Sequence, residues 1–254
     1  MDGKIKLLLF TLASFIFLFI VLFLSKRYIK KKKTRDLMIL ISAIVTIIIH
    51  YSIILFDYFM GNPIQIDNTM YLPVYPCNVM MWVALVIGVI NKDGKVFSYL
   101  SEFMAFAGTI CGVIGLGFNT NFLNNPDFSD YSILKGLLSH VTLLYSSLYL
   151  FVMGYIKVDT IHNLISVSIG GLIYVICGVY SRIMLKALNQ EMVNTMFLDF
   201  NPENPIENFF VIALLGFIIL VVIGSIYETI FFEEENRWYH KLRKRREKQW
   251  EIFS

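Results

Sequence analysis

The sequence has little charge. Only 16% of its 254 residues are Asp, Glu, Lys or Arg, whereas an ordinary soluble domain has about a quarter. Hydrophobic residues make up 57% of the chain, and the mean hydropathy is +0.65. Several apolar runs reach about 20 residues, enough for a helix to cross about 30 Å of hydrocarbon, and they do not alternate as barrel strands do. The composition excludes a soluble domain of ordinary size and predicts an all-α, polytopic membrane protein.

Common signatures of chemistry are missing as well. We find no metal-ligand spacing, no Gly-rich phosphate loop after a strand and no Ser-centred nucleophile elbow. The three cysteines, Cys77, Cys111 and Cys177, all fall in apolar runs, which argues against a disulfide framework. The basic clusters flank apolar runs and form no nucleic-acid face. We therefore expect neither a metal nor a nucleic-acid partner.

Seven apolar segments are long enough to be membrane spans. They cover residues 5–24, 36–60, 72–91, 97–118, 132–155, 159–183 and 207–232. The first resembles a signal peptide, but a dense basic block follows it without a small-residue cleavage site, as in an anchor that stays. We predict a seven-span transmembrane domain over residues 1–232 and a basic tail over residues 233–254.

The basic residues predict the orientation. Most of the 22 Lys and Arg residues lie in the segment 26–35, in the tail, and at Lys92, Lys95 and Lys157. With seven spans all of these fall on one side, which the positive-inside rule makes cytoplasmic. The N-terminus is then outside and the C-terminus in the cytoplasm of a multi-pass cell-membrane protein. The tail suits the anionic inner leaflet; a topology signal is the simpler interpretation, and a specific lipid or protein contact is the alternative.

The stretch around Cys77 raises the question of a nucleophile. Cys77 lies between Pro76 and Asn78 near the outer start of the third expected span. A helix N-terminus carries partial positive charge, which favours thiolate over thiol, and Pro is tolerated in a first turn. Asn78 adds an amide that could orient a base or donate to a developing oxyanion. The alternative is a Cys that packs as a small hydrophobe, the role we predict for Cys111 and Cys177 beside their glycines.

Two histidines, His50 and His140, lie inside expected spans, where ionisable side chains are rare and suggest function. His140 is about 12 Å below the outer start of its span, and Cys77 is about 9 Å below its own. If these spans are neighbours, the imidazole can activate the thiol. A structural hydrogen bond between helices is the alternative for His140. Glu102 falls near the inner side and Asp57 near the outer surface.

Three segments carry a family resemblance. They are Tyr75-Pro76-Cys77-Asn78-Val79, then Ser139-His140-Val141 followed by Tyr145 and Tyr149-Leu150, then Asn194-Thr195-Met196 followed by Asp199. In this order the chain resembles the YwaF-like integral membrane proteins, which include the eukaryotic seven-helix transmembrane acyltransferase acting on ether phospholipids. The similarity covers roughly residues 36–232.

The resemblance implies Cys77 as the acyl-accepting nucleophile and His140 as its general base. Tyr75, Asn78 and Asn194 would be polar residues on the substrate side, with Asn194 at the outer mouth. The chain departs from many bacterial members, which have a His where this chain has Tyr75 and often an Asp where it has Asn78. The roles of these two neighbours are therefore the least transferable part of the resemblance.

The leading hypothesis is a phospholipid acyltransferase or transacylase. A Cys77 thioester would form from a phospholipid ester at the outer leaflet, and a lysolipid or a lipid-anchored acceptor such as a lipoprotein would take the acyl chain. Since the donor ester supplies the activation, we expect no cofactor. The rival is a non-catalytic transport or scaffold protein in which Glu102, Asp57 and His50 mark a polar path. A receptor-like seven-helix module is a weaker third interpretation, because the outer loops are short.

Overall fold

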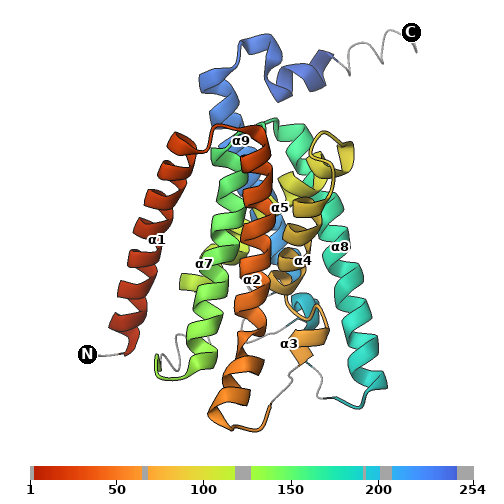
Figure 1. Cartoon of the computed structure of the whole chain (residues 1–254). Helices are drawn as coiled ribbons and strands as arrows, with labels where there is room; N and C mark the ends of the chain where they lie inside the picture. The colour runs from red at the N-terminus through yellow and green to blue at the C-terminus, as the bar shows by residue number, and fades with distance from the viewer. Residues whose placement is uncertain (1–2, 65–67, 118–126, 191–192, 201–207, 245–254) are drawn as a thin grey trace.

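The computed structural model describes residues 3–64, 68–117, 127–190, 193–200 and 208–244, and it shows a bundle of helices (Figure 1). Within these described residues, six helices are long and apolar enough to cross a membrane. They are α1 (Gly3–Tyr28), α2 (Lys32–Met60), α5 (Lys95–Gly117), α7 (Tyr131–Val152), α8 (Thr160–Ala187) and α9 (Phe209–Phe231). The two chain ends lie at opposite ends of the bundle. The predicted all-α, polytopic membrane class is confirmed.

The remaining expected span forms the shorter helix α4 (Pro76–Val89). Its 14 residues extend about 21 Å at the α-helical rise, less than the hydrocarbon thickness of about 30 Å. The prediction of a span over 72–91 is therefore too long at both ends. Tyr75 is extended (φ −115°, ψ 154°) because a residue before Pro is disfavoured in the helical region, so the helix begins at Pro76.

Side chains and a nearby ammonium group fix several helix ends. Asp130, Asp159 and Asn208 precede α7, α8 and α9, and each accepts a hydrogen bond from a backbone N–H of the first turn, as N-cap residues do. At the other end of α4, Lys92 Nζ donates to the backbone oxygens of Ile87, Gly88 and Ile90 at 2.6–2.8 Å. Burial lowers the pKa of this Lys92 ammonium.

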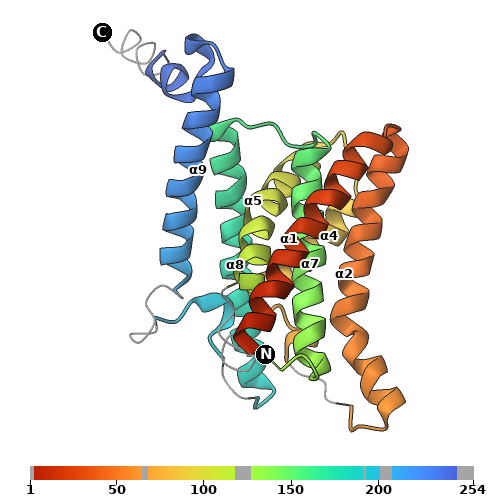
Figure 2. The ribbon, with the colours of Figure 1, turned by 90° about the vertical axis from the view of Figure 1, so that its left-hand side faces the viewer.

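Helices α5 and α7 form the centre of the bundle. Helix α2 packs against α7 and α4, and α5 packs against α4 and α8. Helix α1 lies beside α7 and α9 beside α8 (Figures 1 and 2). Small residues permit the close crossings, because a Cβ added to Gly88 of α4 would lie 2.9 Å from Cα of Leu40 on α2. The main hydrophobic cluster in this centre includes the buried side chains of Met80, Phe103, Met104, Leu143 and Tyr149.

Basic segments gather at one end of the bundle. The α1–α2 connection, the α4–α5 and α7–α8 connections and the C-terminal segment all lie there (Figure 1), as the sequence analysis predicts. We call this the basic end, and the other the opposite end. The assignment of the basic end to the cytoplasm stays a prediction, as does a separate tail over 233–254, of which residues 245–254 lie outside the described part.

Glu228 joins three segments at the basic end. It is 1% exposed, and its carboxylate accepts hydrogen bonds from N and Oγ1 of Thr160 and from N of Trp238 at 2.6–2.8 Å. Gly224, one turn earlier on α9, lies against the same Thr160 side chain. Helix α9, the start of α8 and the C-terminal segment therefore share one buried carboxylate.

We expect Glu228→Ala to lower the free energy of unfolding by at least about 3 kcal/mol, because hydrogen bonds to a charged group contribute about 1.5–3 kcal/mol each. Thermal unfolding in detergent measures the effect. Glu235→Ala is the matched control: its carboxylate is exposed and 3.6 Å from Lys244 Nζ, so the change should stay within about 0.5 kcal/mol. Equal unfolding midpoints for the two variants would contradict the assignment.

Candidate functional site

Cys77 is the second residue of α4, and this helix begins inside the bundle. Helices α2 and α4 run in opposite directions, and Gly88 lies against Leu40. Counting back from this contact, Pro76 is level with about residue 52 of α2, roughly 12 Å short of the end of α2 at Met60. Figure 1 shows α2 continuing past the start of α4. The first turn of α4, with the Cys77 thiol, is therefore recessed from the opposite end.

Two extended segments cover this recessed helix start. The first is the connection between α3 (Asn68–Tyr71) and α4. The second contains the short helix η1 (Thr195–Phe197). Met196 N donates to Val74 O at 2.7 Å, and Thr195 Oγ1 donates to Gly178 O of α8 at 3.0 Å. Val74 and Met196 are almost fully buried. The segment that contains Asn194 thus packs directly against the segment that precedes Cys77.

The polar residues around Cys77 have structural partners of their own. Asn78 is 5% exposed, and its Oδ1 accepts from Tyr75 N at 3.1 Å. The Tyr75 ring lies 6.0 Å from that of Phe197. Asn194 Nδ2 donates to Asp199 O at 3.0 Å, and its Oδ1 accepts from Asp199 N at 2.8 Å. The structure therefore places Asn194 near the helix start and uses its amide to hold its own loop closed.

All three cysteines lie within electrostatic range of one buried hydroxyl group, that of Tyr174. Cys111 Sγ on α5 lies 3.7 Å from the hydroxyl of Tyr174 on α8, and Cys77 and Cys177 lie within electrostatic range of the same hydroxyl. The Cys77 and Cys111 thiols also lie within electrostatic range of each other. From the sequence, Cys111 and Cys177 are each predicted to be packing residues beside a glycine. No sequence signal reveals the cluster, because it depends on how α4, α5 and α8 pack.

His140 faces α5 at nearly the same level. A Cβ added to Gly115 would overlap with Nδ1 of His140, so the imidazole packs directly on this glycine. His50 of α2 lies within electrostatic range of His140. Gly115 is one turn beyond Cys111, about 6 Å along α5. Cys111, which lies within electrostatic range of Cys77, and Gly115, which lies against His140, are therefore one turn apart on α5.

We expect Gly115→Ala to displace the His140 ring and to destabilise the protein by about 1–3 kcal/mol, the usual range for overpacking. Gly117→Ala is the control on the same helix, since a Cβ there would have no atom within 4 Å. Thermal unfolding of both variants in the same detergent measures the difference. A Gly115→Ala protein as stable as Gly117→Ala would show that the imidazole does not depend on this glycine.

A second polar cluster lies toward the basic end. Glu102 of α5 is 5% exposed; its Oε2 accepts from Ser166 Oγ at 2.6 Å and lies 2.8 Å from His162 Nδ1. Glu102 is nine residues before Cys111, about 14 Å along α5. Because Ser166 and His162 contact the same carboxylate oxygen, they do not form a Ser–His–acid relay. Asp57 is buried in the last turn of α2, at the opposite end of the bundle. Within the described residues no group of three potential ligands could hold a metal ion.

The fold and this site define a polytopic α-helical membrane protein with a thiol at the start of a short, recessed helix. Residues 4–227 match the TMEM164 family, and the chain belongs to this transmembrane protein family. No curated protein and no solved structure matches the chain.

Proposed function

We propose that the protein is a membrane-embedded acyltransferase or transacylase that carries a fatty acyl chain on Cys77. The observation that supports this most is the recessed start of α4, which holds a thiol in the first turn of a helix within the membrane domain. The partial positive charge at the N-terminal end of a helix offsets part of the cost of forming a thiolate at this buried position, and an adjacent general base is needed to supply the rest. The resemblance to the YwaF-like acyltransferase points the same way.

His140 is the proposed base. In the first step its imidazole takes the thiol proton, and the Cys77 sulfur forms a bond to the ester carbonyl carbon of a phospholipid. The ester C–O bond then breaks, and the leaving lysolipid alkoxide receives the proton from the imidazolium. In the second step the His140 imidazole takes a proton from an acceptor hydroxyl or amine, whose oxygen or nitrogen forms a bond to the thioester carbonyl carbon. The C–S bond then breaks, and the imidazolium returns the proton to the Cys77 sulfur. Each step is balanced without a cofactor, because the donor ester supplies the activated acyl group.

The surrounding polar residues have proposed supporting roles. Asn78 lies next to Cys77, and its side-chain N–H group is the proposed donor to the tetrahedral oxyanion, the charge that such donors stabilise. Tyr75 and the loop held by Asn194 form the cover of the recess and would contact the lipid headgroup. If the basic end is cytoplasmic, the start of α4 lies toward the outer leaflet of the cell membrane. A phospholipid is then the accessible donor, and a lysolipid or a lipoprotein is the accessible acceptor.

Transport or a scaffold role is the second candidate. It is favoured by the ionisable residues Glu102, His50 and Asp57 inside the bundle. However, Glu102 is bound to Ser166 and His162 at the basic end, and the centre of the bundle holds the packed cluster that includes Met80, Met104 and Leu143. This arrangement supports a site confined to one half of the membrane more than a path across it.

An acyl-exchange assay tests the proposed function. The purified protein in phospholipid vesicles would be given an isotope-labelled lysophospholipid, and mass spectrometry would follow its conversion to labelled phospholipid. We expect conversion that depends on the protein and needs no acyl-CoA. Flux of ions or small solutes across the same vesicles, with no acyl exchange for any of several donor and acceptor headgroups, would favour the transport candidate.

A further inference from the structure

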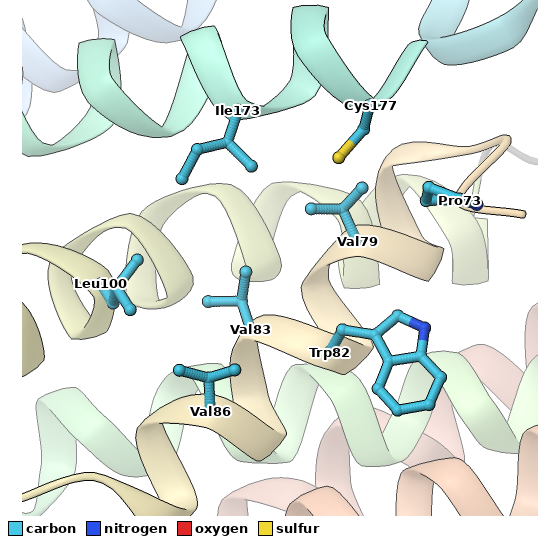
Figure 3. A pocket seen from close by; sticks show the side chains of 8 residues that line it. All are labelled: Pro73, Val79, Trp82, Val83, Val86, Leu100, Ile173 and Cys177. Carbon is cyan, nitrogen blue, oxygen red and sulfur yellow. The ribbon is translucent and has the colours of Figure 1, made fainter. Parts of the chain in front are cut away.

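A groove between α4 and α8 lies beside the thiol cluster. Its volume is about 320 Å³. Helix α5 packs against both α4 and α8, which contact each other little, so α5 forms the floor and the groove opens sideways. Figure 3 shows Ile173 and Cys177 of α8 facing Val79 and Val83 of α4, with Pro73 at one end and Leu100 of α5 at the other.

The lining of this groove is apolar. Three of the residues contributed by α4 are valines, and the fourth is Trp82. Trp82 and Val86 are each 44% exposed at the rim, whereas Val79 and Val83 are nearly buried. The groove lies along the membrane-crossing part of the bundle, where the surrounding medium is hydrocarbon. A hydrocarbon chain therefore matches both its lining and its surroundings.

The direction of the groove matches a lipid tail that is attached near Cys77. Pro73 and Val79 line the end of the groove that lies at the same end of α4 as Cys77, and Cys177 in its wall lies within electrostatic range of the Tyr174 hydroxyl. Because residues two apart on a helix point to nearly opposite sides, the acyl chain would pass from Cys77 around the first turn of α4 into the groove. From Val79 to Val86 the groove follows α4 for about 10 Å toward the basic end. A phospholipid whose ester lies at the recessed helix start would direct its acyl chain along this line, toward the middle of the bilayer.

We propose that the α4–α8 groove is the binding site for the acyl chain of the phospholipid donor and that its lining selects the chain. This inference rests on the proposed function for the direction of the chain, but binding in the groove does not require the chemistry. Val86 and Leu100 lie toward the methyl end of the bound chain and are the residues expected to limit its length.

Photocrosslinking tests the site without catalysis. The full-length Cys77→Ala protein would be placed in phosphatidylethanolamine and phosphatidylglycerol vesicles that contain a phospholipid with a diazirine within one acyl chain. After irradiation, peptide mass spectrometry locates the attached chain. We expect more labelling on the groove faces of α4 and α8 than on the lipid-facing surface of α9. Labelling spread evenly over α1, α4, α8 and α9, or a protein–protein crosslink showing a second copy in the groove, would overturn the proposal.

A pair of substitutions on α4 sharpens the test. In the Cys77→Ala background, Val86→Trp fills the groove, and labelling of α4 and α8 should fall to the level seen on α9. Val89→Trp is the control, because Val89 is 69% exposed on the same helix and does not line the groove; labelling should remain. Thermal unfolding shows whether each variant is folded. Equal labelling of the two folded variants would overturn the proposal.

The two proposals can fail separately. If the groove is labelled but the wild-type protein exchanges no acyl groups, the groove is a lipid-binding site and the proposed acyltransferase activity is wrong. If the protein exchanges acyl groups but the groove is not selectively labelled, the acyltransferase activity stands and the groove is not the binding site of the acyl chain. With Cys77 intact, Leu100→Ala should shift the preferred donor toward longer acyl chains, and an unchanged chain-length profile would contradict the selection role.

Discussion

Cys77→Ala is expected to abolish acyl exchange between phospholipid and labelled lysophospholipid. The rate should fall by at least about 10³-fold, since the group that forms the covalent intermediate is lost and residual catalysis then comes from binding alone. Cys77→Ser should be nearly as inactive, because a hydroxyl is far less acidic than a thiol. The assay is conversion of labelled lysophospholipid in vesicles, followed by mass spectrometry.

Cys111→Ala is the matched control for this result. Cys111 belongs to the same thiol cluster and lies 3.7 Å from the Tyr174 hydroxyl, so its removal perturbs the same surroundings without removing the proposed nucleophile. We expect its rate to stay within about tenfold of wild type, as for a change that alters packing by no more than about 1.4 kcal/mol. If Cys77→Ala keeps wild-type exchange, or if Cys111→Ala is the inactive variant, Cys77 is not the nucleophile.

His140→Gln should lower the exchange rate by about 10²–10⁴-fold, the usual contribution of a positioned general base. The substitution keeps a polar side chain of similar size on Gly115, so packing should change little. His162→Gln is the control, because His162 lies with Glu102 at the basic end and has no part in the proposed chemistry. Its rate should equal that of wild type.

Chemical rescue separates a base from a packing residue at this position. His140→Ala leaves space beside Gly115, and added imidazole should restore part of the exchange rate in this variant but not in Cys77→Ala. A purely structural role for His140 predicts no rescue and a loss of thermal stability instead. Equal rates for His140→Gln and wild type would remove His140 from the mechanism.

Much of the fold can be predicted from the sequence, because membrane helices are governed by length and hydropathy. Six of the seven predicted spans correspond to long helices, and basic residues such as Lys92 mark one end of the bundle. The ends of α4 are less predictable. Residues 72–75 are apolar enough to belong to a membrane-spanning helix, yet Pro76 keeps Tyr75 extended. The segment from Leu72 to Tyr75 therefore packs against the Met196 segment instead of extending the helix.

The candidate site could be predicted only in part. A thiol after Pro in an apolar run, and a histidine within a span, single out Cys77 and His140 from sequence alone. Their surroundings depend on contacts between distant segments. Gly115 packs against the His140 ring only because α5 and α7 cross there. The Tyr174 hydroxyl contacts Cys111, and lies within electrostatic range of Cys77 and Cys177, only because α8 packs beside α5.

Whether Cys77 carries the acyl chain can be measured by the intact mass of the purified protein after incubation with phospholipid vesicles, before and after neutral hydroxylamine. We expect an added acyl mass on the wild-type chain that hydroxylamine removes, as it cleaves a thioester, and that is present on Cys111→Ala but absent from Cys77→Ala. An acyl mass of equal amount on Cys77→Ala, or none on a wild-type chain that is actively exchanging acyl groups, would contradict a Cys77 thioester as the intermediate.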